Sequence, residues 1–117
     1  MWETLNKRKF PRLQVNCTVF VKDQNSAYFQ TTQTENIGVG GVCLFLNRMI
    51  PNFTPVNLSL ELVKGDSHPI ECSAKVVWCI KSQGGVQDNP RFDTGVEFLD
   101  MQSGDRERIR TFIQGRL

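Results

Sequence analysis

The stretch IECSAKVVWCIK, residues 70–81, has an apolar side chain at every second position along its whole length. Side chains two positions apart share a face of an extended strand. The alternation therefore predicts one long, half-buried strand. The side chains expected on its apolar face are Ile70, Cys72, Ala74, Val76, Trp78 and Ile80.

Five further stretches have the alternation or the composition of strands. They are residues 14–22, 28–35, 42–46, 56–63 and 92–99. Turn-forming sequences such as DQNS and KGDSHP separate them. Six strands at this short spacing predict a mainly β protein, built as an antiparallel barrel or sandwich.

The period of the sequence changes after Ser103, which is expected to cap a helix. Ile109, Phe112 and Ile113 then fall at helical spacing, and Leu117 follows them. We expect one amphipathic helix lying across the strands. Four arginines interleaved with acids are interpreted as its solvated face. They are Arg106, Arg108, Arg110 and Arg116.

The length of 117 residues predicts one domain with a core of its own. The longest apolar runs are too short to cross a bilayer, and the start, MWETLNKRK, lacks the apolar segment of a signal peptide. A cytoplasmic location is therefore expected. The four cysteines lack the close pairing of zinc ligands, so they are interpreted as reduced thiols and no metal site is predicted.

Catalytic residues are not evident in the sequence. His68 is the only histidine, and it is interpreted as an exposed side chain in the turn between Ser67 and Pro69. No serine or cysteine lies in a nucleophile-elbow pattern. The glycine stretch GVGG lacks the lysine that ends a phosphate-binding P-loop. The sequence therefore predicts a protein that is not an enzyme and needs no cofactor.

A basic group precedes the first predicted strand. Lys7, Arg8, Lys9 and Arg12 fall within six residues that contain no acid. Pro11 disfavours helix in the residue before it, so this segment is expected to be extended or turned. Arginine forks match phosphate oxygens and also the O6/N7 edge of guanine. The alternative is a basic chain end without a function.

The sequence NIGVGG, residues 36–41, carries a second candidate site. Asn36 can form hydrogen bonds within a turn or to the edge of a base. Gly38, Gly40 and Gly41 can adopt positive φ and permit a close approach of the backbone to another group. The alternative is a tight connection between strands that contains a bulge.

Together, in this order and on this pattern of strands, the two motifs resemble those of the PilZ domain family. The first family motif, RxxxR, is matched in full by residues 8–12, with the basic Lys7 ahead of it. The second, [DN]xSxxG, is matched at Asn36 and Gly41, whereas Gly38 stands at the position of the serine. The stretches AKVVW and TGVEFL also resemble the closing strands of the family.

The resemblance implies a six-stranded antiparallel PilZ-type β-barrel followed by a C-terminal α-helix. Residues 1–13 would be a flexible segment carrying RxxxR, and residues 14–117 would be the barrel and its helix. It also implies a receptor for cyclic di-GMP in bacterial signalling, acting on motility, polysaccharide production or biofilm formation. The implied ligand-binding residues are Lys7, Arg8, Arg12, Asn36, Gly38, Gly40 and Gly41.

The resemblance further implies a protein partner of unknown identity, without nucleic-acid binding or membrane insertion, and either a monomer or a dimer. Gly38 keeps open a second hypothesis, in which the domain is an adaptor that binds a protein and not the nucleotide. A third hypothesis is a barrel that binds single-stranded nucleic acid by base stacking. Phe20, Tyr28 and Phe45 would be its candidate aromatic residues.

Overall fold

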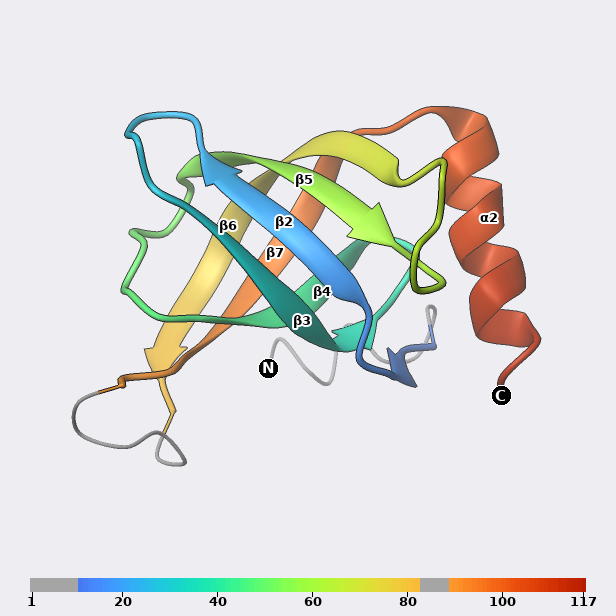
Figure 1. The fold of residues 1–117 in the computed structure, drawn as a ribbon, viewed down its shortest axis with the longest axis horizontal. Coiled ribbons are helices and arrows are strands. Elements are labelled where there is room, and N and C mark those ends of the chain that lie inside the picture. The colour runs from blue at the N-terminus through green and yellow to red at the C-terminus, as the bar shows by residue number, and fades with distance from the viewer. Residues whose placement is uncertain (1–10, 83–88) are drawn as a thin grey trace.

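The computed structural model describes residues 11–82 and 89–117, and their strands form one closed ring (Figure 1). Neighbours in the ring follow the order β3, β2, β5, β6, β7 and β4, and β4 pairs with β3 to close it. Every pairing is antiparallel. The elements are β1 (Leu13–Gln14), β2 (Thr18–Asp23), β3 (Phe29–Ile37), β4 (Gly41–Leu46), β5 (Pro55–Glu61), β6 (Ile70–Lys81), β7 (Phe92–Asp100) and α2 (Ser103–Gln114).

The predicted six-stranded antiparallel barrel with a C-terminal helix is therefore confirmed. The two-residue strand β1 is an addition, which pairs with the end of β3 outside the ring. Residues 1–10, the larger part of the predicted N-terminal segment, lie outside the described residues. Leu13, which that segment was expected to include, is the first residue of β1.

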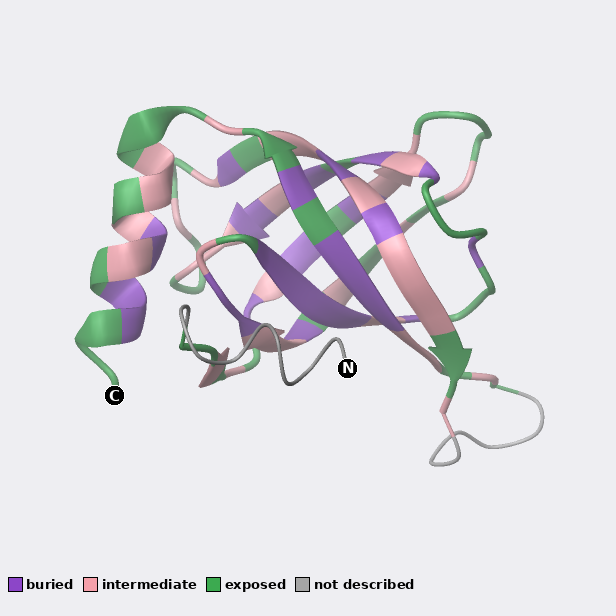
Figure 2. Cartoon of the chain, turned by 180° about the vertical axis from the view of Figure 1, so that it is seen from behind, coloured by how far each residue is buried: buried purple, intermediate pink, exposed green. Residues whose placement is uncertain are grey.

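The core is filled from inside the ring and closed at one side by the helix. On β5 the alternation places Val56, Leu58 and Leu60 in the interior, where they are buried. The face of α2 that is turned toward the barrel is also buried (Figure 2). It carries Ile109 and Phe112, which the helical spacing predicted for the core, together with Ile113.

The long strand β6 keeps its predicted bounds but not one continuous apolar face. Val76 pairs with Val96 on β7, whereas Trp78 pairs with the preceding Gly95, so the strand contains a bulge at Val77. A bulge inserts one extra residue and reverses the alternation beyond it. Ile80, which was predicted on the apolar face, is consequently 61% exposed.

The stretch predicted as one strand over residues 14–22 is broken between β1 and β2. Thr34 of β3 is fully buried there, and its hydroxyl donates to the carbonyl of Val15 at 2.6 Å. The same hydroxyl accepts a hydrogen bond from the N–H of Cys17 at 2.9 Å. The hydroxyl of Thr34 thus provides hydrogen bonds to two backbone groups that the break leaves without a strand partner. Buried polar groups need such hydrogen-bond partners.

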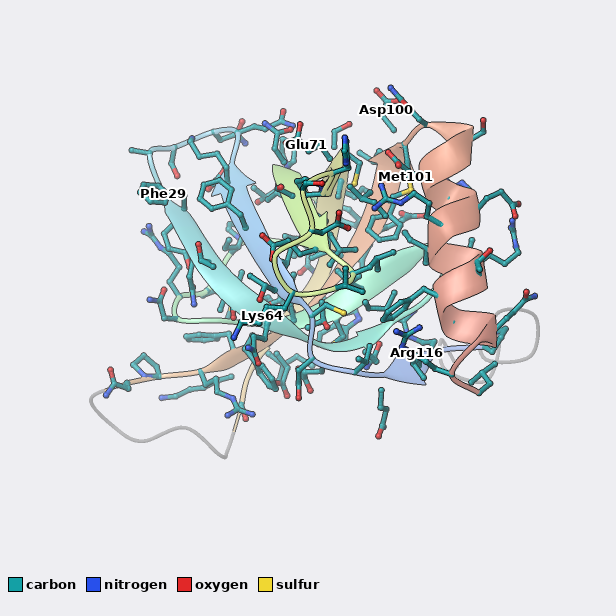
Figure 3. All side chains as sticks on the ribbon, turned by 45° about the vertical axis from the view of Figure 1, so that its right-hand side comes forward. Phe29, Lys64, Glu71, Asp100, Met101 and Arg116 are labelled. Carbon is teal, nitrogen blue, oxygen red and sulfur yellow. The ribbon has the colours of Figure 1, made fainter. Side chains whose placement is uncertain are left out.

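The helix begins differently from the prediction. Gln102, whose backbone is extended, occupies the N-cap position, and no side chain caps the helix. Ser103 is already its first helical residue, so the predicted serine cap is wrong. Leu117 lies beyond the helix and is 71% exposed. Met101 lies beside the first turn of α2 (Figure 3).

The arginines of α2 are not simply a solvated face. Arg108 donates to Asp66 Oδ2 and to the carbonyl of His68, both at 2.9 Å, so it ties the helix to the loop between β5 and β6. Arg106 bonds to the barrel as well, at Val39. Arg110 pairs with Glu107 on the helix itself. No helix within the described residues is long and apolar enough to cross a membrane.

Candidate ligand-binding site

The pairing of β1 with β3 brings the two sequence motifs together. Gln14 faces Asn36 and Leu13 faces Ile37, in antiparallel register. One step further along this ladder, Arg12 lies opposite Gly38. The two-residue strand is therefore the element that positions the arginine against the glycine turn.

The guanidinium of Arg12 lies on that turn. Its Nε donates to Asn36 Oδ1 at 2.7 Å, and its Nη2 donates to the carbonyl of Gly41 at 3.4 Å. The side chain reaches solvent, but the turn removes part of the water around its charge. This burial lowers the pKa of Arg12, and the opposing influence of Cys43 is smaller. Arginine nevertheless stays protonated in proteins, so the site carries a fixed positive charge.

The turn itself spans residues 38–41 and is held from several directions. The N–H of Gly38 donates to the carbonyl of Gly41 at 2.8 Å, which closes the turn. The N–H of Phe98 on β7 donates to the carbonyl of Gly40 at 2.9 Å. A Cβ atom at position 41 would lie 2.2 Å from the carbonyl oxygen of Val96, so only glycine fits there.

The three motif glycines, which can adopt positive φ, do not do so here. Gly65, in the loop after β5, is the only described glycine with positive φ. The requirement at Gly41 is close approach to β7, and at Gly38 it is close approach to Arg12. A Cβ atom at position 38 would lie 2.9 Å from Arg12 Nη1 and 3.5 Å from its Cζ. A Cβ atom at position 40 would have no atom of the rest of the described chain within 4 Å.

A row of paired residues continues from Asn36 across the outside of the barrel. Asn36 pairs with Cys43 on β4, Cys43 with Gly95 on β7, and Gly95 with Trp78 on β6. The indole of Trp78 lies against Gly95, because a Cβ atom there would be 2.3 Å from its Nε1. The row thus has a guanidinium and an amide at one end, an indole at the other, and small residues between.

Carboxyl groups border this row. Glu35 is the extra residue where the β3–β4 register shifts, and its Oε2 accepts a hydrogen bond from the thiol of Cys43 at 3.3 Å. Burial raises the pKa of Glu35, and the neighbouring Asp93 raises it further. Burial and the adjacent Glu35 raise the pKa of Cys43 to about 12. The thiol is therefore neutral near pH 7 and is not a poised nucleophile.

Five of the seven predicted site residues thus come together: Arg12, Asn36, Gly38, Gly40 and Gly41. The other two, Lys7 and Arg8, lie outside the described residues. The sequence reasoning did not assign Arg106, which bonds to the turn, because its spacing matches that of any solvated helix arginine. It also did not assign Trp78, although the pattern AKVVW contains it.

The three aromatic residues considered for base stacking do not form one platform. Phe20 stacks on Phe29, with ring centroids 5.6 Å apart, on a part of the barrel far from α2 (Figure 3). Arg48 covers the ring of Tyr28 at 4.7 Å, and Arg91 covers that of Phe45 at 3.7 Å. The described part of the chain brings no three His, Cys, Asp or Glu side chains together to hold a metal ion.

A hollow of about 470 Å³ lies elsewhere, between α2 and the segment after β5. Leu62, Asp66, Arg108 and Phe112 line it, and none of the motif residues does. Among the described residues, the motif region therefore offers a ligand a surface site and not a closed pocket. Its groups are the charged, planar guanidinium of Arg12, the side-chain amide of Asn36 and the 38–41 turn. These features define a small antiparallel β-barrel domain with a candidate surface site for a ligand.

Comparisons with known proteins agree with this class. The sequence matches the PilZ domain over residues 6–115, and the chain belongs to the PilZ domain family. PilZ domains are non-catalytic, which supports the prediction that the chain is not an enzyme. No curated protein sequence matches the chain.

Solved structures share the fold at low sequence identity. The PilZ domain of YcgR from Escherichia coli with c-di-GMP has a TM-score of 0.71 at 11% identity, covering 94% of this chain and 91% of that one. The Bacillus subtilis inhibitor of motility, MotI/DgrA, has a TM-score of 0.73 at 18% identity, covering 93% of this chain and 50% of that one. The K. pneumonia MrkH–c-di-GMP complex has a TM-score of 0.67 at 14% identity, covering 92% of this chain and 51% of that one. The chain thus spans about half of the latter two proteins.

Proposed function

We propose that this domain is a receptor for cyclic di-GMP and that it binds the nucleotide at Arg12, Asn36 and the 38–41 turn. The observation that carries the proposal is the hydrogen bond of 2.7 Å between Arg12 Nε and Asn36 Oδ1. It joins the two motifs that are separated by 24 residues in the sequence. Membership of the PilZ family, and the nucleotide in the YcgR and MrkH structures of the same fold, support the same ligand.

The chemistry of the site suits this nucleotide. Cyclic di-GMP carries two negative charges, which the guanidinium of Arg12 and the basic residues Lys7 and Arg8 would neutralise. An arginine fork also matches the O6/N7 edge of guanine. The glycine turn lets a base approach the backbone, and the indole of Trp78 offers an apolar face at the other end of the row. The expected setting is the bacterial cytoplasm, with motility, polysaccharide or biofilm formation as the output.

A second candidate function is that of a protein adaptor that does not bind the nucleotide. The observation that favours it is Gly38, where the family motif has a serine whose hydroxyl could bond a ligand. One such hydrogen bond contributes about 0.5–1.5 kcal/mol, which corresponds to roughly a two- to tenfold change in affinity. The loss therefore weakens nucleotide binding without preventing it.

Isothermal titration calorimetry with cyclic di-GMP separates the two candidates and also gives the stoichiometry. Cyclic di-AMP is the control ligand, because adenine has an amino donor where guanine has the O6 acceptor. The receptor proposal expects saturable binding of cyclic di-GMP and much weaker binding of cyclic di-AMP. Absence of binding to cyclic di-GMP at millimolar concentration would reject it in favour of the adaptor.

A further inference from the structure

The turn of the candidate site is bonded to the C-terminal helix by one arginine. Arg106, in the first part of α2, donates from Nη1 to the carbonyl of Val39 at 3.1 Å. The two residues are 67 positions apart in the sequence, and the contact is partly buried. A hydrogen bond from a charged guanidinium is stronger than one between neutral groups. The helix therefore holds the middle of the turn.

This bond fixes the orientation of a peptide group. In a planar trans peptide, the carbonyl of Val39 and the N–H of Gly40 point in opposite directions. Arg106 directs the carbonyl toward α2, so the N–H of Gly40 points away from the helix. Glycine at positions 40 and 41 lowers the cost of other backbone conformations, so the sequence of the turn alone would not hold this orientation.

The next peptide group is held from another side. The carbonyl of Gly40 accepts from the N–H of Phe98 at 2.9 Å, and Phe98 is anchored in the barrel core. This second bond depends on β7 and not on the helix. Among the hydrogen bonds of the described residues, the bond from Arg106 is thus the one that makes the turn depend on α2.

We propose that Arg106 is a positioning residue of the candidate site, and that it couples the docking of α2 to the conformation of the ligand-binding turn. Its consequence for ligand affinity rests on the proposed binding of cyclic di-GMP. Coupling between two sites is reciprocal in free energy, so a ligand that orders the turn also stabilises the docked helix. The helix would then report the state of the site to another protein.

The test uses Arg106→Gln, which removes the charge and shortens the reach of the side chain. Arg106→Lys is the conservative variant, because it keeps a charged donor. Arg108→Gln is the matched control, since Arg108 ties the same helix to Asp66 and His68 and has no bond to the turn. Amide hydrogen exchange and cyclic di-GMP titration are measured for all three and for the parent.

Without nucleotide, we expect faster amide exchange at residues 39–41 in Arg106→Gln and unchanged exchange there in Arg108→Gln. In the titration, Arg106→Gln should bind about tenfold more weakly, with partial recovery in Arg106→Lys. Arg108→Gln should bind within about twofold of the parent, because Arg108 shares no bond with the turn and sites without shared partners couple weakly. In the parent, and not in Arg106→Gln, nucleotide should slow exchange in α2.

Each alternative result has one meaning. Equal exchange at residues 39–41 in Arg106→Gln and the parent would overturn the positioning role, whatever the nucleotide does. Equal loss of affinity in Arg106→Gln and Arg108→Gln would also overturn it, because general helix docking would then explain both. A parent that binds no cyclic di-GMP would reject the proposed function, and the exchange measurement without nucleotide would still decide the role of Arg106.

Discussion

Nη1 of Arg12 lies 2.9 Å from the place that a Cβ atom would take on Gly38. The guanidinium thus occupies the space that the side chain of the motif serine would need. The glycine at position 38 and the placement of Arg12 over the turn belong together as one arrangement. The departure from the family motif thus leaves room for the arginine as well as removing a hydroxyl.

Substitutions at Gly38 separate these two effects. Gly38→Ala displaces the guanidinium without adding a hydroxyl, and we expect cyclic di-GMP affinity to fall about threefold to tenfold. Gly38→Ser displaces it equally but adds a donor, so it should bind up to about tenfold more tightly than Gly38→Ala. Calorimetric titration gives both values. Unchanged affinity in Gly38→Ala would show that the guanidinium leaves the turn when ligand binds.

The melting temperature should change little in both variants. Gly38 does not have positive φ, so a side chain there causes no backbone strain. The atom that must move is at the end of a flexible side chain, Arg12 Nη1. A large loss of stability in either variant would contradict this account of the turn.

Arg12→Ala should weaken cyclic di-GMP binding by at least about tenfold and leave the barrel intact. A charge-assisted hydrogen bond contributes about 1.5–3 kcal/mol, whereas an exposed polar contact adds little to folding stability. Arg110→Ala is the matched control, because Arg110 pairs only with Glu107 on its own helix among the described ion pairs. Arg8→Ala should resemble Arg12→Ala, on the basis of the RxxxR motif. Equal affinities of Arg12→Ala and Arg110→Ala would reject the assigned site.

Gly41→Ala should destabilise the fold, unlike the neighbouring Gly40→Ala. The new methyl group at position 41 would lie 2.2 Å from the carbonyl oxygen of Val96. Both the turn and β7 are backbone at this contact, so neither can move away without disturbing the strand pairing. Overpacking of this kind costs about 1–3 kcal/mol or more, which lowers the melting temperature by at least about 3 °C. Gly40 has open space around it and should tolerate alanine. Thermal unfolding of the two variants, side by side, measures the difference.

Glu35→Gln should make the protein more stable near neutral pH than the parent. Burial, with Asp93 beside it, raises the pKa of Glu35 in the folded state. A carboxyl with a raised folded pKa loses stability as pH rises from its unfolded pKa through its folded pKa. The amide removes that loss and can still accept from the thiol of Cys43. Since the group is partly solvated, the gain should be below about 1 kcal/mol.

The pH dependence distinguishes this effect from better packing. Below about pH 4 Glu35 is largely protonated in both states, so the advantage of Glu35→Gln should disappear there. Urea unfolding at several pH values measures it, with the exposed Glu71→Gln on the outer face of β6 as control. An advantage that persists unchanged at low pH would contradict the assignment to this carboxyl.

The sequence predicted the number of strands in the ring and the core face of the helix well, because period and composition report burial directly. On β5 and in α2 the apolar spacing led to the correct buried residues. It failed at Val77, because a bulge depends on how the strand pairs with its partner. It also failed at the break between β1 and β2, where the hydrogen bonds come from Thr34 of another strand. Ser103 was predicted as the cap because serine is a preferred N-cap residue. The helix begins one residue earlier than that prediction, so Gln102 occupies the N-cap position.

The site was predictable only in part, for a similar reason. The motif resemblance identified Arg12, Asn36 and the glycines, but not the geometry that relates them. The contact between Arg12 and Gly38 depends on the register of β1 against β3. The bond from Arg106 to Val39 depends on how α2 docks. Such contacts between distant segments are set only by the folded chain and not by local sequence.

The pairing of β1 with β3 also has a mechanical consequence. Two residue pairs hold Arg12 in place, Leu13 with Ile37 and Gln14 with Asn36, and they lie outside the closed ring. Local opening of so short a ladder needs far less free energy than global unfolding. A protein that pulled on the chain ahead of Leu13 would therefore peel the arginine from the turn and dismantle the site while the barrel stayed folded.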